Sequence, residues 1–570
     1  MDDKKQRMKN RRLHIILYTI LVIVLFLPLA QYAFGIFKFR PLWGSATKAT
    51  KSDFTFSNLA SGKYQADAEN YLSENYGLRQ PTVRLYNQFL WTFFKKTYAN
   101  DVVLGTNGWL YFDKNVKTYY GTYQPTLFEN NAEAKSKYDR NIRVLNKLRH
   151  VLKDFDIEFM AYISPDKCYV FPDNIPDRQP DTTTIDATKY FTESFDRLGF
   201  PYIEMSQMYK NIADTLFYTP FSPGGAHWNF SCVYAADTII HLIEKTGNIN
   251  LAQIQIGEYR QYNEYEETVK HRCDYDIESM LNLMFRRDHS KYPLYLADIT
   301  IVSDSTCVKP NVLFVGNSFL WRIKDFVHFD EIFSNPRLWY YNKEAYDLAT
   351  LAMKPTKKLD KTFEILLSDY IVTFCGDTQL NQISFGFAGE TLIKLCLPDS
   401  IVEKKTDEIC KKQNISKDKA IKIINDNPEL FDELKGDAIP TIRNPKSVAV
   451  YNAISSIKND KDWVDILGGH ARYLNMSTKD LMELEMKNIL DGNTLMRDCD
   501  TIVCKQNYQA AVDKLIKYWE NDNEKMKYFE NKAKQRGKST HEMMTIDAKY
   551  TIVTDKGKYF PRIFNNNQTE

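Results

Sequence analysis

The hydrophobic pattern of the chain begins with one long apolar stretch. Residues 13–37 carry no charged side chain, apart from His14 when it is protonated. About 20 apolar residues span the core of a bilayer, so this stretch predicts a transmembrane anchor. Residues 1–12 carry six basic side chains. Such a flank stays in the cytoplasm, so the pattern predicts a single-pass cell-membrane protein whose remaining chain is extracytoplasmic, on the periplasmic or cell-surface side.

A cleaved signal peptide is the alternative interpretation of the same segment. The apolar run is long for a signal, and no small-residue cleavage motif follows it. These two features favour an uncleaved anchor. No second stretch of this kind occurs in the sequence, so the remaining chain is predicted to form one exported region.

Beyond the anchor, the periodicity changes twice. Residues 38–97 read as a helical lead-in, because apolar positions recur among polar ones at helical spacing. Residues 98–395 then alternate helical stretches with short runs rich in β-branched and aromatic residues, which predicts an α/β domain with a mainly parallel sheet. The predicted strands include residues 157–163, 202–203, 312–315 and 370–374.

Residues 396–570 are helical in pattern, highly charged and internally repeated. Residues 453–487 align with residues 515–549 at a constant offset of 62. The aligned serines Ser477 and Ser539 each have an acidic residue three positions later, which is the pattern of a helix N-cap, with Glu the better partner than Asp. This pattern predicts a C-terminal α-helical repeat module of stacked short helices, with an accessory or docking role rather than a second enzyme activity.

Composition and charge remove several function classes. The 570 residues include 75 basic and 73 acidic side chains, a balance that gives no reason to expect a nucleic-acid partner. The nine cysteines are widely spaced and match neither a zinc site nor a dense disulfide framework. Cys499 and Cys504 can pair if the compartment is oxidising, and most of the cysteines are predicted to be separate buried thiols. No phosphate loop, metal-ligand cluster or dinucleotide fingerprint occurs, so neither cofactor nor metal is predicted.

Ser318 stands at the most informative position for chemistry. It follows the predicted strand 312–315 and Gly316, and a helix is predicted to begin just after it. Open α/β sheets bind ligands outside the carboxyl ends of their strands, where helix-terminal amides can stabilise an oxyanion. The alternative is a serine that only caps the helix. The Gly-x-Ser-x-Gly elbow is absent, which argues against an ordinary α/β-hydrolase.

A nucleophilic serine needs a base within hydrogen-bond reach, and His227 has the most suggestive setting of the nine histidines. It follows a Pro-Gly-Gly loop, precedes Trp228, and lies ahead of the predicted helix 232–245. A structural role is the open alternative for this histidine.

Several short segments of the sequence, which include those around Ser318 and His227, together resemble the alginate O-acetyltransferase family of SGNH-hydrolase-like proteins (the AlgJ/AlgX type). The resemblance covers about residues 70–390 and implies an SGNH-hydrolase-like fold, with Ser318 and His227 as catalytic residues. The segments that match in order are Asn75-Tyr-Gly-Leu-Arg79, Val103-Leu-Gly-Thr-Asn-Gly-Trp109-Leu-Tyr-Phe, Ile163-Ser-Pro-Asp-Lys167, Phe171-Pro-Asp-Asn-Ile-Pro176, His227-Trp228, Asp276-Ile-Glu-Ser-Met-Leu-Asn282-Leu and Gly316-Asn-Ser318-Phe.

The sequence departs from the family pattern at two positions. Gly225 stands where the family's Asp-x-His-Trp motif has its aspartate, so the acid that would orient His227 is missing there. Asp377, just past the predicted strand 370–374, is the candidate replacement, with a surface turn as its alternative and Asp304 as a poorer candidate. Asn317 replaces the aspartate of Gly-Asp-Ser and is predicted to contact substrate.

The resemblance implies acyl transfer through a covalent ester on Ser318, with an acetyl group donated to a hydroxyl of a cell-surface or exported polysaccharide. It also implies a multispanning membrane acyltransferase that supplies the acyl group. Trp109 and Trp228 are candidate glycan contacts together with Tyr111 and Trp321, although aromatic side chains also build cores. Two alternatives stay open: an esterase with the same Ser–His pair, and an inert glycan-binding or scaffold protein, which Gly225 suggests.

Overall fold

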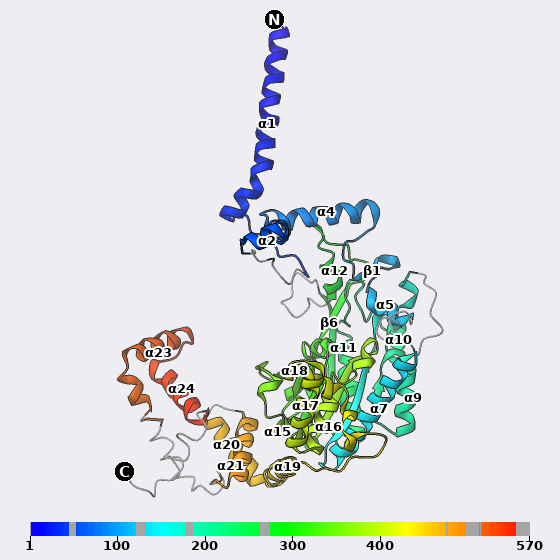
Figure 1. The fold of residues 1–570 in the computed structure, drawn as a ribbon, viewed down its shortest axis with the longest axis vertical. Coiled ribbons are helices and arrows are strands. Elements are labelled where there is room, and N and C mark those ends of the chain that lie inside the picture. Colours follow the sequence, from blue (N-terminus) through cyan, green and yellow to red (C-terminus); the bar gives the residue numbers. More distant parts are fainter. Residues whose placement is uncertain are drawn as a thin grey trace.

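The structure is a computed structural model with three parts (Figure 1). Helix α1 projects from one end, an α/β body forms the centre, and helices α23 and α24 lie to one side of that body. The residues that it describes are 2–44, 49, 53–120, 131–176, 186–262, 274–474, 477–493, 495, 512–513 and 515–554.

A seven-stranded sheet in the order β10-β9-β8-β7-β11-β3-β4 forms the centre of the α/β body. The strands from β8 to β4 pair in parallel, and β9 and β10 continue the sheet antiparallel. The strands are β3 (Glu158–Ser164), β4 (Tyr202–Glu204), β7 (Val312–Gly316), β8 (Arg337–Tyr340), β9 (Glu344–Asp347), β10 (Met353–Pro355) and β11 (Tyr370–Gly376). The predicted α/β class with a mainly parallel sheet is therefore confirmed.

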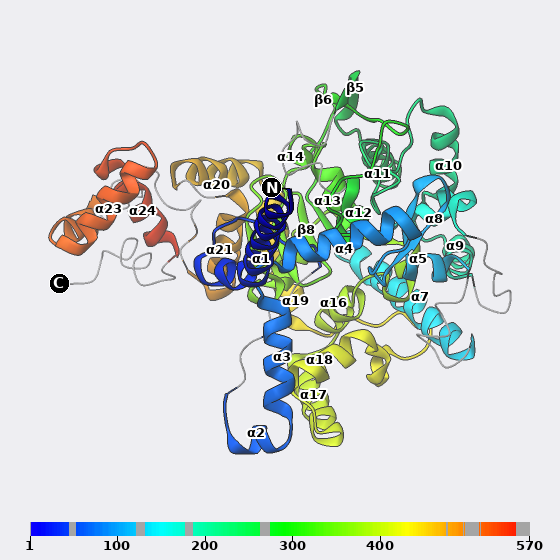
Figure 2. The same cartoon turned by 90° about the horizontal axis from the view of Figure 1, so that it is seen from above.

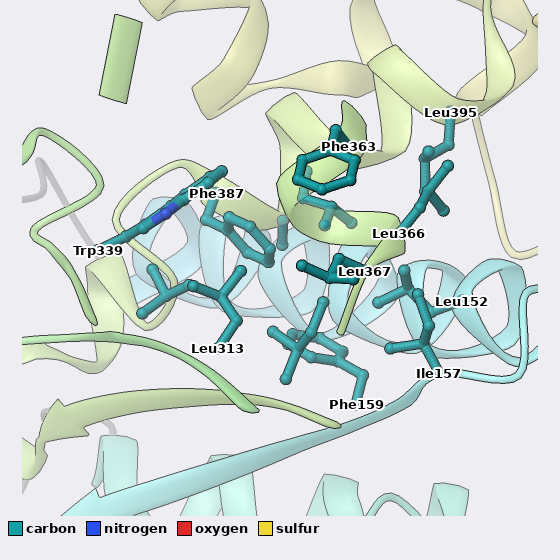
Figure 3. Close-up of a cluster of buried hydrophobic side chains, with 14 of the residues drawn as sticks. Leu152, Ile157, Phe159, Leu313, Trp339, Phe363, Leu366, Leu367, Phe387 and Leu395 are labelled. Atoms are coloured by element: carbon teal, nitrogen blue, oxygen red, sulfur yellow. The ribbon is translucent and has the colours of Figure 1, made fainter. Parts of the chain in front are cut away.

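Each central strand buries both faces, as a parallel sheet covered by helices requires. Along β3, Phe159 and Ile163 enter the core cluster on one face, and Met160 and Tyr162 enter the cluster on the other. The first cluster, shown in Figure 3, lies against α7 (Asn131–Lys153), α9 (Ala187–Leu198), α15 (Lys361–Leu366) and α16 (Phe387–Cys396). The second lies against α10 (Ser206–Thr215), α11 (Cys232–Gly247), α13 (Ser318–Lys324) and α14 (Phe329–Ile332).

Two antiparallel strand pairs and several short helices complete the body. The pairs are β1 (Val102–Leu104) with β2 (Leu110–Phe112) and β5 (Gln253–Tyr262) with β6 (Leu294–Val302). The short α-helices are α5 (Asp113–Tyr119), α8 (Lys167–Val170) and α12 (Asp276–Met280). The 3-10 turns are η1 (Thr106–Gly108), η2 (Pro172–Asn174), η4 (Thr356–Lys358), η5 (Asp377–Gln382), η6 (Pro428–Leu430) and η7 (Asp432–Leu434).

The N-terminal region contains the helix predicted as an anchor. Within α1 (Asp2–Phe34), the 24 residues Arg11–Phe34 form the one helix in the described part of the chain that is long and apolar enough to cross a membrane. The apolar stretch of this helix is not buried against the rest of the protein, which fits a single-pass anchor. The helices that follow are α2 (Phe56–Ala60), α3 (Lys63–Asn75) and α4 (Arg79–Phe94).

The C-terminal region is helical, as predicted. Its helices are α17 (Asp399–Gln413), α18 (Lys417–Asp426), α19 (Pro445–Lys458), α20 (Lys461–Leu474), α21 (Thr478–Asp491), α23 (Asn523–Gln535) and α24 (Thr540–Thr554). Helices α20 and α23 begin 62 residues apart, as do α21 and α24. Their capping serines differ as predicted, since Glu542 accepts hydrogen bonds from both the amide and the hydroxyl of Ser539. The repeat organisation itself stays a prediction.

The cysteines that the structure describes are free thiols. Cys168, Cys232, Cys375 and Cys396 are buried, in agreement with the prediction, while Cys307 and Cys410 are partly exposed. The predicted pairing of Cys499 with Cys504 lies outside the described residues.

Candidate active site

Ser318 lies at the carboxyl end of a central strand. Strand β7 ends at Gly316, and Ser318 is the first residue of α13. Gly316 lets the end of β7 lie close against β11, because a Cβ there would lie 2.9 Å from the Cβ of Phe374. Asn317 caps the helix, with its Oδ1 accepting a hydrogen bond from the amide of Phe319 at 3.1 Å. The strand, the glycine and the cap together leave the Ser318 side chain half-buried at the edge of the sheet.

His227 meets Ser318 across this edge. Its Nε2 lies 2.7 Å from the Ser318 Oγ, within hydrogen-bond reach. The ring of Phe319 packs beside the imidazole, with the two ring centroids 4.9 Å apart. The loop that carries His227 closes through a backbone bridge between Phe221 and Trp228. The two residues singled out from the sequence are therefore in direct contact, although 91 positions separate them.

The third member of the constellation is Asp276, the first residue of α12. Its Oδ2 lies 2.7 Å from Nδ1 of His227, and its Oδ1 accepts hydrogen bonds from the amides of Ala226 and Ile277. A carboxylate oxygen only accepts, so the imidazole proton lies on Nδ1, and the lone pair of Nε2 faces the Ser318 hydroxyl. The geometry is that of a Ser-His-Asp triad.

The acid expected at Asp377 is thus supplied by another residue. Asp377 is 1% exposed at the end of β11, and its Oδ2 accepts a hydrogen bond from the amide of Asp166 at 3.0 Å. Burial, together with the charge of Asp166, raises the pKa of Asp377 well above its usual range. Asp304, the poorer candidate, bonds the amide and hydroxyl of Thr306 in its own turn. Neither residue takes the position on His227 that Asp276 occupies.

A buried lysine holds the loop that carries His227. Lys167 is 2% exposed, and its Nζ donates to the carbonyl oxygens of Ser222, Pro223 and Gly225. The ammonium also lies 5.4 Å from the ring centroid of Trp109. Burial lowers the pKa of Lys167 to about 7. The side chain therefore ties the end of β3 to the turn just before His227.

Gly224 explains why this turn approaches α12 so closely. A Cβ at this position would lie 3.0 Å from both Glu278 Oε2 and Tyr275 Cδ1. The amide of Glu278 also donates to the Gly224 carbonyl oxygen at 2.9 Å. A side chain at Gly224 would push the loop away from the helix that carries Asp276.

Arg322 joins the three segments that carry the triad. It lies on α13 with Ser318, its Nε donates to the carbonyl oxygen of Trp228, and its NH2 nitrogen lies 2.8 Å from Asp274 Oδ1. Neither side chain of the Arg322–Asp274 pair is exposed. Because Trp228 follows His227 and Asp274 precedes Asp276 by two residues, one guanidinium connects all three segments.

Three side chains predicted to contact substrate are buried instead. Trp109 is 2% exposed, and Trp228 is fully buried, with its Nε1 donating to the carbonyl oxygen of Phe319 at 3.1 Å. Asn317 is 2% exposed, and its Nδ2 donates to Gln379 Oε1 at 2.7 Å. The rings of Trp109 and Trp228 therefore offer no exposed face on which a sugar could stack, and the Asn317 amide is engaged within the protein. Tyr111 is also buried, while Trp321 is half-buried.

Sequence reasoning missed Asp276, Lys167 and Arg322. Asp276 and Lys167 lie within the motifs that carry the family resemblance, and this was the signal that could have singled them out. Arg322 had no such signal. In the part of the chain that the structure describes, no group of three or more His, Cys, Asp or Glu side chains is placed to hold a metal ion.

Comparison with known proteins gives structural matches only. No protein-family model matches the sequence, and no curated protein matches it. The O-acetyltransferase domain of Pseudomonas putida AlgJ matches with 15% identity over 49% of this chain and 92% of its own length, with a TM-score of 0.33. Pseudomonas aeruginosa AlgX matches with 10% identity over 53% and 70%, with a TM-score of 0.31. Bacillus cereus PatB1 matches with 11% identity over 43% and 90%, with a TM-score of 0.26.

The chain is therefore similar to solved structures that include the two types to which its motifs lead. What the site can do follows from its own geometry.

Proposed function

We propose that this chain is a membrane-anchored, extracytoplasmic O-acetyltransferase that acetylates hydroxyl groups of a cell-surface or exported polysaccharide. The observation that carries the proposal is the alignment of Ser318, His227 and Asp276, with 2.7 Å at both junctions. Such a constellation activates a serine for attack on an acyl carbonyl.

The first half-reaction forms an acetyl ester on the serine. His227 Nε2 takes the hydroxyl proton while Ser318 Oγ attacks the carbonyl carbon of the acyl donor. The imidazolium that forms is stabilised by Asp276, which lies on Nδ1. The proton then passes from Nε2 to the leaving group as the bond between the acyl carbon and the donor breaks.

The second half-reaction transfers the acetyl group to the acceptor. A polysaccharide hydroxyl takes the place of the leaving group, gives its proton to His227 Nε2 and attacks the ester carbonyl. Collapse of the tetrahedral intermediate frees Ser318, whose Oγ recovers the proton from the histidine. An esterase would follow the same steps with water as the acceptor.

Transfer is favoured over hydrolysis by the ordered sequence motifs, which resemble an O-acetyltransferase family over about residues 70–390. The alternative of an inert scaffold rested on the absence of an acid at Gly225. It loses this support because the Asp276 carboxylate lies against Nδ1 of His227, where an orienting acid is needed.

The proposal places α1 in the cell membrane and the body outside it, in line with the basic residues of positions 1–12. A multispanning membrane acyltransferase would supply the acyl donor. Residues 396–570 would serve as an accessory repeat module for glycan or partner contacts.

The test uses the purified full chain in detergent with a soluble acetyl ester, with and without an oligosaccharide acceptor. Transfer predicts acetylated oligosaccharide, detected by mass spectrometry, and a covalent adduct of Ser318 with a sulfonyl fluoride probe. The Ser318→Ala variant should lose both signals, with a fall in kcat of about 10⁶.

The other outcomes are equally distinct. Acetate release that is independent of the acceptor would favour the esterase. Full transferase activity in Ser318→Ala would refute the mechanism. Glycan binding without labelling of Ser318 would favour the scaffold.

A further inference from the structure

Helix α4 has an apolar face with no protein partner in the described part of the chain. Leu85, Phe89 and Phe93 follow one another at a spacing of four residues and therefore lie on one side of the helix. Their exposed fractions are 60%, 49% and 69%. Tyr86 and Tyr98 extend the same exposed region, with their ring centroids 5.5 Å apart. Soluble proteins rarely expose apolar side chains in a contiguous group of this kind unless the surface binds something.

The opposite side of α4 is attached to the α/β body. Asn87 Nδ2 donates to the carbonyl oxygen of Leu281 at 2.9 Å, and Arg84 Nη1 donates to that of Leu283 at 3.4 Å. The guanidinium of Arg287 lies 5.2 Å from the ring centroid of Trp91. The apolar face of Leu85, Phe89 and Phe93 consequently points away from the body.

That direction is the side from which α1 projects. Figure 1 shows α4 lying across the axis of α1, with α1 on one side of it and α12 and β1 on the other. Figure 2, viewed along the long axis, shows α1 nearly end-on and α4 extending sideways from it.

The junction between α1 and α4 is closely packed. A Cβ on Gly77, two residues before α4, would lie 2.3 Å from the Pro28 carbonyl oxygen of α1. The hydroxyl groups of Tyr32 and Tyr71 are 3.0 Å apart and connect α1 to α3. These contacts set the direction of α4 relative to α1.

We propose that the apolar face of α4 lies in the lipid surface of the membrane that α1 spans, as an interfacial amphipathic helix. The inference rests on the anchor proposed for α1. Aromatic side chains are enriched at the membrane–water interface, and a helix that lies in this plane buries its apolar face at the boundary between headgroups and acyl chains.

The charged residues around α4 also favour contact with a lipid surface. No acidic residue occurs between Glu74 and Asp101, a stretch that contains the whole helix. Exposed basic side chains occur nearby in the chain: Lys95 and Lys96 directly follow the helix, and Lys38 and Arg40 lie in the segment that leaves α1. Lipid phosphates would meet cations here rather than carboxylates, which favours a lipid surface over a basic protein partner.

A membrane-bound α4 would also hold the active site at a set position relative to the bilayer. Its Asn87 bonds the turn at Leu281, which directly follows α12, the helix that begins with Asp276. In the same turn, the Asn282 side chain exchanges two hydrogen bonds with the backbone of Trp43, in the segment that leaves α1. The triad is thus connected to the membrane-facing helix through one short turn.

The experiment is photo-crosslinking of the full chain in vesicles of phosphatidylcholine and phosphatidylglycerol. The photoreactive residue p-benzoylphenylalanine replaces Phe89 or Phe93 in separate variants. The same residue at Leu21, in the apolar part of α1, tests the anchor, and at Tyr528, an exposed aromatic position on α23, gives the background. Thermal unfolding followed by circular dichroism confirms that each variant is folded, and adducts are identified by mass spectrometry.

Lipid adducts at Phe89 and Phe93 are expected at yields near that at Leu21 and about tenfold or more above that at Tyr528. Background yields at both α4 positions, with high yield at Leu21, would overturn the inference and leave the anchor intact. Protein–protein adducts at Phe93 would overturn it in favour of a second copy of the chain. Background yield at Leu21 as well would remove the anchor together with the inference.

Discussion

The carboxylate of Asp276 contacts both the imidazole ring of His227 and the backbone amide of the residue before it. Oδ2 lies 2.7 Å from Nδ1 of the imidazole, and Oδ1 accepts a hydrogen bond at 2.7 Å from the amide of Ala226, the residue just before the histidine. The carboxylate therefore fixes the tautomer, the ring orientation and the position of the loop at once. An acid two residues before the histidine would have to fold back to do the same, whereas Asp276 approaches from a separate helix.

The triad acid can be distinguished from the buried acid by two matched amide variants. Asp276→Asn keeps the size of the side chain but can donate to the ring, so it favours the wrong tautomer and should lower kcat by about 10⁴. Asp377→Asn should leave kcat within about threefold, because an amide oxygen can still accept from the amide of Asp166. Steady-state kinetics on the acetyl ester measures both, and equal losses would contradict the assignment.

The pH dependence of stability should reveal the buried amine of Lys167. Its pKa falls from the usual 10.5 to about 7 on folding, mainly through burial. Below pH 7 both states hold the proton, so the penalty of burying the charge is fully present. Between pH 7 and 10.5 only the unfolded state holds it, and the free energy of unfolding should rise with pH by up to about 1.4 kcal/mol per unit.

Urea unfolding at several pH values, for the natural chain and for Lys167→Met, measures this rise. The difference in unfolding free energy between the two proteins should change across this window in favour of the natural chain. A difference that stays constant with pH would show that the Lys167 amine does not titrate there.

The connection made by Arg322 should matter for stability. Arg322→Met leaves the Asp274 carboxylate buried without the guanidinium and should cost about 3–5 kcal/mol of unfolding free energy. Lys422→Met is the matched control, because the Lys422 and Asp426 side chains are 77% and 49% exposed. The control should change stability by less than about 0.5 kcal/mol in the same urea titration. Losses of similar size in both variants would contradict the role given to Arg322.

Trp228 should act through packing rather than through glycan binding. Trp228→Phe removes the hydrogen bond to the Phe319 carbonyl oxygen and leaves a small void, which should lower the unfolding free energy by about 1–3 kcal/mol. The KM for the acceptor should not change, because the ring does not reach the surface. A higher KM at unchanged stability would restore the glycan contact predicted from the sequence.

Local pattern was enough to predict much of this molecule. Hydrophobic runs located the anchor candidate and the three central strands β3, β7 and β11, since burial on both faces leaves a continuous apolar signal. The strand–Gly316–Ser318 succession also placed the serine at the end of its strand, because a strand, a glycine and a helix cap are adjacent in sequence.

Other features depended on contacts between distant segments. The exposure of Trp109 and Trp228 could not be read from their types, because an aromatic side chain is equally suited to a core and to a sugar. Asp377 was a reasonable choice from its place after a strand, yet its carboxylate turns into the core and bonds Asp166.

By itself, the sequence determined the class of sheet, the candidate nucleophile and the candidate base, because each depends on a hydrophobic run or a motif of a few adjacent residues. Only the tertiary structure decided which acid completes the triad. Asp276 lies 49 positions from His227, and a hydrogen bond at 2.7 Å requires α12 and the histidine loop to pack together. That packing depends on the absence of a side chain at Gly224 and on the buried side chains of Lys167 and Arg322, and local periodicity reveals none of these contacts.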